Sequence, residues 1–272
     1  MVGSKTNYFG SLSDVIDPYG RQARLYPALI AIFPVALLIV AWFPALWTTF
    51  GILISLATSF GLVLLLSQLG RDRGKRCEPL LHQSWGGKPS VVLLHHADTR
   101  IDDHTKSRYR AFISRSLPGL ALPTPAEEGA DPTKADKAYE SVTAWLLTQT
   151  RDTKRFSILF KENIAYGFRR NLWGLKPMGL TISLLGAVIS TGLVAFGYIS
   201  IGRIPVPEIV IATAAVWALS LIWVFIVTPA WVRLPADAYG MQLLAACDTL
   251  ALPTSKPATG RKTSRPGKSV TN

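Results

Sequence analysis

Residues 25–69 read LYPALIAIFPVALLIVAWFPALWTTFGILISLATSFGLVLLLSQL, and none of these 45 side chains is charged. A helix needs about 20 apolar residues to cross the hydrocarbon core of a bilayer, so this run is long enough for two crossings. Residues 43–45 (FPA) interrupt it near the middle, where a tight turn fits. The stretch therefore predicts a helical hairpin in a membrane, with spans at about 25–45 and 49–69.

Two further runs without charge, 177–202 and 209–232, predict spans at about 178–200 and 209–231. Hydrophobic residues make up 49% of the 272 residues, and the mean hydropathy is positive. The chain is too apolar for an ordinary soluble domain and too charged to lie wholly in a membrane. We expect a mainly α, polytopic membrane protein with four transmembrane helices and a mostly helical cytoplasmic domain between spans 2 and 3.

Basic residues flank these spans on one side of the membrane, and the opposite turns carry only Arg203 near Glu208. The flanking residues are Arg71, Arg73, Lys75, Arg76, Arg169, Arg170, Lys176 and Arg233. Because cytoplasmic loops are enriched in Lys and Arg, both termini and the middle segment are expected inside the cell. No signal-peptide pattern precedes the first span, so we expect an uncleaved, multi-pass protein of the inner (cytoplasmic) membrane.

The charge pattern divides the chain into six segments. We expect a cytoplasmic lead at 1–24, transmembrane helices 1 and 2 at 25–69, a cytoplasmic domain at 70–177, transmembrane helices 3 and 4 at 178–232, a short cytoplasmic helix at 233–252, and a disordered basic tail at 253–272.

Local signals predict the helices of the cytoplasmic domain. Asp102 or Asp103 is suited to cap a helix that ends near Ser116, and Asp131 before Pro132 predicts a helix that ends near Thr150. A further helix is expected from about residue 153. Residues 117–128 are rich in proline and small residues and predict a loop.

Basic side chains at both membrane-proximal ends of the domain are the main candidates for ligand binding. Residues 71–115 hold ten Lys or Arg and five Asp or Glu, and residues 151–176 hold seven and two. Arginine's planar fork suits phosphate, and Tyr166, Phe168 or Trp173 could stack on bases. The candidate ligand-binding residues are Arg71, Arg73, Lys75, Arg76, Arg108, Arg110, Arg169 and Arg170.

Anionic lipid headgroups are the simpler partner for the cations next to the spans, because each Lys or Arg near an anionic leaflet contributes roughly 1 kcal/mol. Arg108 and Arg110 lie further along the domain and are harder to explain in this way. In the second span, Gly51, Ser55 and Ser59 recur at a spacing of four, which predicts either close helix packing or a pore lining.

Signals for catalysis are weak. Residues 95–104 (HHADTRIDDH), with His82 nearby, could bind Zn²⁺ or Mn²⁺, yet adjacent histidines point to different faces of a regular element. Residues 70–76 (GRDRGKR) lack the glycine spacing of a phosphate loop and have Arg76 where Ser or Thr is needed. We expect no metal or cofactor, and we expect Cys77 and Cys247 to be free thiols.

Three stretches, RDRGKRCEPLLHQSWGGKPS (71–90), TRDTKRF (150–156) and FKENIAYGFRRNLWGLKP (160–177), resemble uncharacterised bacterial four-span membrane proteins. The chain also resembles the channel-type membrane effectors of anti-phage defence, including the Hailong type. In those systems a partner nucleotidyltransferase makes a nucleotide or oligonucleotide signal that controls a membrane pore. The resemblance implies a homo-oligomer gated by such a ligand, and it carries no residue-level motif.

Three function classes stay open from the sequence. The first is a membrane effector or ion-channel subunit, controlled by an anionic nucleotide, which could be cyclic, or by an oligonucleotide, at its basic cytoplasmic domain. The second is a non-conducting anchor or scaffold that recruits a cytoplasmic partner. The third is a metal-dependent membrane enzyme that uses residues 95–104. The absence of charge within the spans argues against a proton-coupled pump.

The predicted topology can be tested by cysteine labelling of intact cells with a membrane-impermeant reagent. A cysteine introduced at Thr48, in the turn after the first span, should be modified, while Cys77 should be spared. Labelling of Cys77 with a silent Thr48→Cys would overturn the predicted orientation.

Overall fold

The computed structural model of the chain describes residues 17–44, 49–202 and 206–251, without the side chains of 49–50, 52–60, 62–63 and 201. Every regular element in these ranges is helical, so the mainly α prediction is confirmed. The predicted disordered tail (253–272) and most of the predicted lead (1–24) lie outside the described residues, as does part of the turn between the first two spans.

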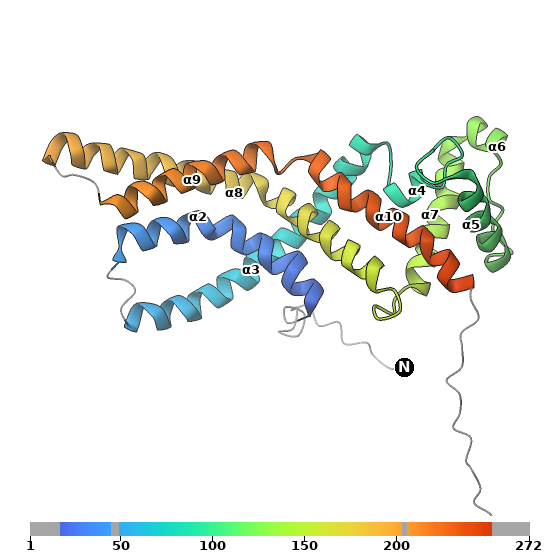
Figure 1. Ribbon diagram of the computed structural model, residues 1–272, viewed down its shortest axis with the longest axis horizontal. Helices are drawn as coiled ribbons and strands as arrows, with labels where there is room; N and C mark the ends of the chain where they lie inside the picture. The colour runs from blue at the N-terminus through green and yellow to red at the C-terminus, as the bar shows by residue number, and fades with distance from the viewer. Residues whose placement is uncertain (1–16, 45–48, 203–205, 252–272) are drawn as a thin grey trace, which may run out of the picture.

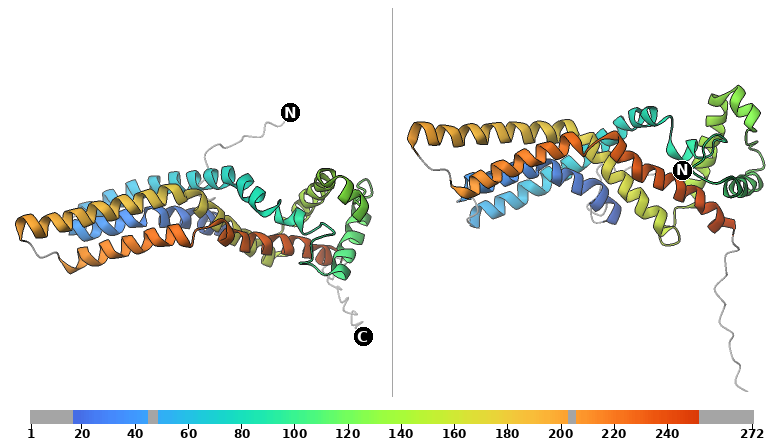
Figure 2. Two further views of the ribbon diagram at one scale, coloured as in Figure 1. Left: turned by 90° about the horizontal axis from the view of Figure 1, so that it is seen from above. Right: turned by 45° about the horizontal axis from the view of Figure 1, so that its top comes forward.

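In the described part of the chain, five long helical elements build an elongated molecule, and four shorter helices form one end of it (Figure 1). The long elements are η1 (Gly20–Leu25) continued by α2 (Tyr26–Trp42), α3 (Thr49–Trp85), α8 (Ser157–Ile201), α9 (Pro207–Phe225) and α10 (Pro229–Ala251). The shorter helices are α4 (Pro89–Val92), α5 (Asp103–Ser116), α6 (Pro125–Ala130) and α7 (Pro132–Gln149). Helix α8 is central, because it contacts α2, α3, α9 and α10 along its length (Figure 2).

Three of the helices are long and apolar enough to cross a membrane: Gly20–Trp42, Ser157–Ser200 and Pro207–Phe225. The first begins before Leu25, where the uncharged run starts. The second predicted span lies in α3, whose side chains are mostly outside the described residues between 49 and 63. Helix α8, with 45 residues, is about 68 Å long, so it extends well beyond a hydrocarbon core of about 30 Å.

The helix expected to run to residue 231 ends earlier, at Phe225. A new helix, α10, begins at Pro229, and the Thr228 hydroxyl accepts a hydrogen bond from the Trp231 backbone N–H at 3.3 Å. Proline restrains the residue before it to extended conformations, which ends the preceding helix. The Lys176 ammonium donates to the carbonyls of Val224 and Val227, at 3.2 and 2.8 Å, which lose their helical partners at this break.

The capping signals of the domain are confirmed in two places. The Asp102 carboxylate accepts from the Thr105 N–H at the start of α5, and Asp131 accepts from the Lys134 N–H at the start of α7, both at 2.9 Å. The loop predicted at 117–128 is wrong over its last residues. There, Thr124 and Glu127 form a capping box that starts α6 at Pro125.

The core of the domain includes the C-terminal helix, which the sequence predicted only as a separate short element. Tyr139, Val142 and Leu146 of α7 are fully buried, and they share one apolar cluster with Leu243 and Leu244 of α10. The second half of α10 therefore packs as one of the helices of this domain, while its first half runs beside α8 toward the end of the molecule that holds α2 and α9 (Figure 1).

Helices α3 and α8 cross in backbone contact at Gly74 and Gly174, a point that we call the glycine crossing. A Cβ atom at Gly174 would lie 2.6 Å from the Gly74 nitrogen, and one at Gly74 would lie 2.3 Å from the Asn171 side-chain oxygen. One turn away, a Cβ at Gly70 would lie 2.9 Å from Leu175. Gly70 and Gly74 thus form the small-residue ridge of this contact, within the segment that superficially resembles a phosphate loop.

Substitution at the glycine crossing should destabilise the fold. Gly174→Ala forces two backbones apart, and we expect a cost of about 1–3 kcal/mol, measured as a lower Tm in detergent. Gly192→Ala, on the same helix with no atom within 4 Å of the added Cβ, is the matched control and should change stability by no more than about 1 kcal/mol. Equal effects of the two substitutions would show that the contact is not tight.

Candidate functional site

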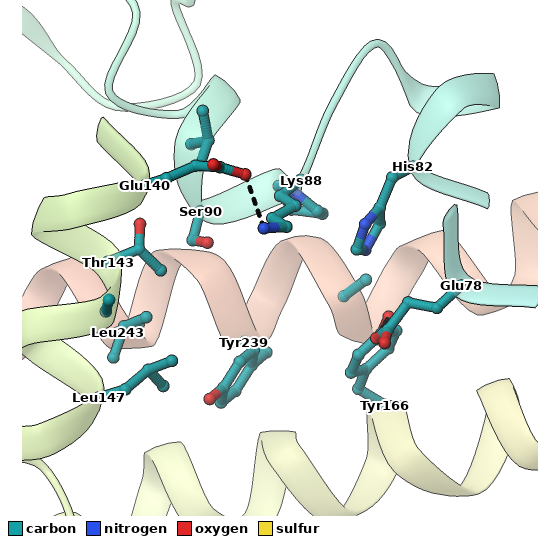
Figure 3. A pocket seen from close by; sticks show the side chains of 14 residues that line it. Glu78, His82, Lys88, Ser90, Glu140, Thr143, Leu147, Tyr166, Tyr239 and Leu243 are labelled. Carbon is teal, nitrogen blue, oxygen red and sulfur yellow. Dashed lines mark hydrogen bonds and ion pairs between the residues drawn. The ribbon is translucent and has the colours of Figure 1, made fainter. Parts of the chain in front are cut away.

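A cavity of about 270 Å³ lies where the domain meets the long helices, and we call it the domain cavity. Its walls come from α4, α7 and α10 and from the parts of α3 and α8 that extend beyond the apolar segments (Figure 3). Glu78 and His82 enter it from α3, and Tyr166 enters it from α8. Glu78 is not among the predicted site residues, although its spacing of four from His82 places both on one face of a helix.

Glu78 is the acceptor of a buried polar network at one end of this cavity. The Tyr166 hydroxyl donates to its carboxylate at 2.5 Å, and the Arg170 guanidinium donates to the same oxygen at 3.0 Å. Burial alone would raise the pKa of Glu78. The positive charge of Arg170 and the two hydrogen bonds outweigh burial and hold the pKa of Glu78 below its ordinary value. The carboxylate therefore stays ionised at neutral pH.

The charged groups around the cavity are balanced. Lys88 and Glu140 form an ion pair of 2.6 Å at its edge, with about half of each side chain exposed (Figure 3). Burial lowers the pKa of His82, an effect that the nearby Glu78 only partly opposes, so the imidazole is neutral at pH 7. With Glu78 paired to Arg170, the cavity carries no net charge and suits a ligand with a neutral, partly apolar body.

Two tyrosines give the cavity an aromatic wall. The rings of Tyr166 and Tyr239 are close to parallel, with centroids 6.4 Å apart and an angle of 13° between the planes. Burial raises the pKa of Tyr239 to about 12, so its hydroxyl remains protonated. That hydroxyl has no hydrogen-bond partner among the described residues, which leaves it free to donate to a ligand.

A second cavity, of about 520 Å³, lies beside the glycine crossing, and we call it the junction cavity. Arg73 and Arg76 of α3 and Lys176 of α8 line it, together with apolar side chains that include Trp173 and Leu180. The structure thus brings together members of the two basic clusters that lie about a hundred residues apart in the sequence. Arg71 and Lys75, of the same clusters, line neither cavity.

The other four candidate arginines hold partners within the chain. Arg108 forms a two-pronged ion pair with Asp248 at 2.8 and 2.9 Å, and Arg110 donates to the carbonyls of Leu94 and Pro123. Arg170 of α8 binds Glu78. Arg169 donates to the Trp231 carbonyl at 2.8 Å and lies over the Trp231 ring. A ligand would reach these guanidinium groups only by displacing protein contacts, and their role in ligand binding stays a prediction.

The predicted pore or packing residues are only partly described. Gly51 is half-buried in α3, whereas the side chains of Ser55 and Ser59 lie outside the described residues. Whether the ridge at 51–59 lines a pore or packs against another helix therefore stays a prediction.

Cys77 and Cys247 are free thiols.

The histidine-rich segment at 95–104 takes part in structural contacts. His95 Nε2 lies 2.7 Å from Asp136, and His96 Nε2 lies 3.1 Å from the Pro123 carbonyl oxygen. The buried Lys106 ammonium binds the carbonyls of His95 and Asp98. Within the described ranges, no group of three or more His, Cys, Asp or Glu side chains is arranged to hold a metal ion.

No protein-family model matches the chain, and no curated protein or solved structure is significantly similar to it. Function is therefore inferred from the domain cavity, from the junction cavity and from the helices that connect them.

The buried network can be tested with Glu78→Gln, which removes the charge that balances Arg170. Glu78 is partly buried, and its loss leaves the guanidinium of Arg170 without its charge partner, so we expect a cost of about 1–3 kcal/mol and a lower Tm at neutral pH. Because the pKa of Glu78 is lowered in the folded state, its contribution is complete at neutral pH and is lost as the pH falls below the ordinary carboxyl range. The difference between wild type and variant should shrink in acid.

Glu162→Gln is the control for this substitution. Glu162 lies on the same helix as Arg170, and it has no ion-pair or hydrogen-bond partner among the described residues. Its neutralisation should leave the Tm nearly unchanged. A stability difference for Glu78→Gln that is small, or that persists unchanged at low pH, would contradict the role of the network.

Proposed function

We propose that this protein is a ligand-controlled membrane effector, in which the helical domain changes the packing of membrane-spanning helices. The main support for this proposal is the set of helices that line the domain cavity. Its walls combine α4 and α7 of the domain with α3 and α8, which continue without a break toward the apolar segments. A ligand in this cavity would contact both the domain and the helices that it is to move.

The coupling needs only a small change at the cavity. Tyr166 and Glu78 lie about one to two helical turns from the glycine crossing, on the same two helices. A ligand that binds one arrangement of these helices better than the other shifts the equilibrium between them. Because both helices are continuous, a tilt at the cavity would be carried through the crossing into the membrane.

The cavity constrains the ligand that we propose. A volume of about 270 Å³ admits one ring system of nucleobase or nucleoside size, and not a whole oligonucleotide. Aromatic rings such as Tyr166 and Tyr239 favour a planar base, and the Tyr239 hydroxyl offers a hydrogen bond. Lys88 at the edge would meet a phosphate of the same ligand if it released Glu140. A small or cyclic nucleotide fits this combination.

The topology, the oligomeric state and the biological role that we propose are based on the sequence and on its resemblance to channel-type membrane effectors. We propose four spans in the inner membrane with both termini in the cytoplasm, and a homo-oligomer whose spans surround an ion path. Closed rotational symmetry is the common arrangement of such assemblies. On the basis of the resemblance, we propose that this activity serves anti-phage defence, with a partner nucleotidyltransferase as the source of the ligand.

A non-conducting anchor or scaffold is the second candidate, and one observation favours it. Arg108, Arg110, Arg169 and Arg170 hold partners within the chain, so the domain offers fewer free cations to a polyanion than its net charge suggests. In this reading the domain recruits a cytoplasmic protein, and the domain cavity has no signalling ligand.

The proposal can be tested by equilibrium binding at low salt and by ion flux from vesicles that contain the purified full-length protein. The probes are ATP, cyclic AMP and a cyclic dinucleotide. We expect at least one of them to bind and to change the flux. Ala144→Trp should fill the cavity and weaken that binding by about tenfold or more.

Ala111→Trp, on the exposed surface of α5 away from the cavity, is the matched control and should behave as wild type. Absence of binding by every probe, together with flux that is absent with and without them, would refute the effector proposal and leave the anchor. Binding that Ala144→Trp and Ala111→Trp affect equally would refute the domain cavity as the site.

A further inference from the structure

The junction cavity contains cations that the fold itself does not use. Arg73 and Arg76 have no ion-pair or hydrogen-bond partner among the described residues. Lys176 donates to two carbonyls at the end of α9, which leaves one of its three N–H donors unused. None of the described residues that line the cavity is acidic. The cavity therefore has three positive charges and no negative charge to balance them.

The apolar part of the lining lies toward the membrane. Along α8 the cavity extends from Trp173 past Lys176 to Leu180, and the uncharged run of the third predicted span begins at Pro177. Along α3 it is lined by Arg73 and Arg76, a few residues beyond Leu69, the last residue of the first uncharged run. The cationic side chains thus lie where the uncharged runs end, and the apolar side chains lie further along the third predicted span. A phospholipid has the same order, with a charged headgroup followed by apolar acyl chains.

We propose that the junction cavity is a specific site for the phosphate headgroup of an anionic phospholipid. Basic pockets between transmembrane helices on the cytoplasmic side are typical sites for such headgroups. Arginine's fork suits the phosphate oxygens, and a volume of about 520 Å³ is sufficient for a headgroup. A soluble phosphate compound offers the same anion, but it has no acyl chain for the apolar side at Pro177 and Leu180.

The location gives this lipid a structural role. Gly174 lines the cavity and is also the residue at which α8 contacts the backbone of α3. Bound lipid would hold Arg73 of α3 and Lys176 of α8 to one headgroup, and so favour the crossed arrangement of the two helices. This site is separate from the domain cavity and does not depend on the function proposed for that cavity.

The test is titration of the purified full-length protein in neutral detergent with short-chain phosphatidylglycerol, followed by thermal stabilisation. Phosphatidylcholine of the same chain length is the headgroup control. Arg73→Gln/Arg76→Gln removes two lining cations and should weaken phosphatidylglycerol binding about 30-fold. Arg71→Gln/Lys75→Gln removes the same charge from the same helix outside the cavity, and should change the affinity by less than about threefold.

Inorganic phosphate and ATP, added as competitors, distinguish a lipid from a soluble phosphate ligand. We expect neither to displace the lipid at millimolar concentration. Equal weakening by the two double variants would mean that surface charge alone attracts the lipid, and would overturn a specific site. Displacement of the lipid by ATP, with the same dependence on Arg73 and Arg76, would overturn the lipid assignment. Both variants should keep the wild-type Tm without lipid, because glutamine preserves the helix.

Discussion

Helices α3 and α8 touch backbone to backbone at the glycine crossing, and this contact sets the positions of the charged groups around it. A Cβ atom at Gly174 would lie 2.6 Å from the Gly74 nitrogen, so the two backbones are in direct contact and leave no room for a side chain. This contact brings Arg170 close enough to pair with Glu78, and it places Arg73 and Lys176 in one cavity. Both cavities described above lie within a few turns of this crossing.

Polar contacts around the crossing make this arrangement specific. Asn171, almost fully buried, donates to the Ala23 carbonyl at 2.7 Å and so ties η1, which continues into α2, to α8. Lys176 and Arg169 bind carbonyls at the break between α9 and α10. Apolar packing alone gives little preference for one arrangement of helices in a membrane, whereas buried polar groups are costly unless they find these partners.

Local signals made much of the fold predictable. Capping by Asp102 and Asp131 needs only residues within one turn, so the starts of both helices were predictable. The partners of Arg108 and Arg110 were not predictable, because Asp248 and Leu94 approach them only through tertiary packing. The same reason explains why Glu78 was missed and why α10 was not assigned to the domain core. The end of α9 could have been predicted from Thr228 and Pro229.

Distances between spin labels would show whether the glycine crossing links the domain to the helices that are long and apolar enough to cross a membrane. In a chain with Cys77→Ala and Cys247→Ala, pulsed EPR would measure one pair on each side of the crossing. The pairs are Leu65 with Leu185, and Leu80 with Ile158, all exposed on α3 and α8. Gly174→Ala should change both distances, whereas Gly192→Ala should change neither. A change confined to one side, or absent from both, would contradict rigid coupling through the crossing.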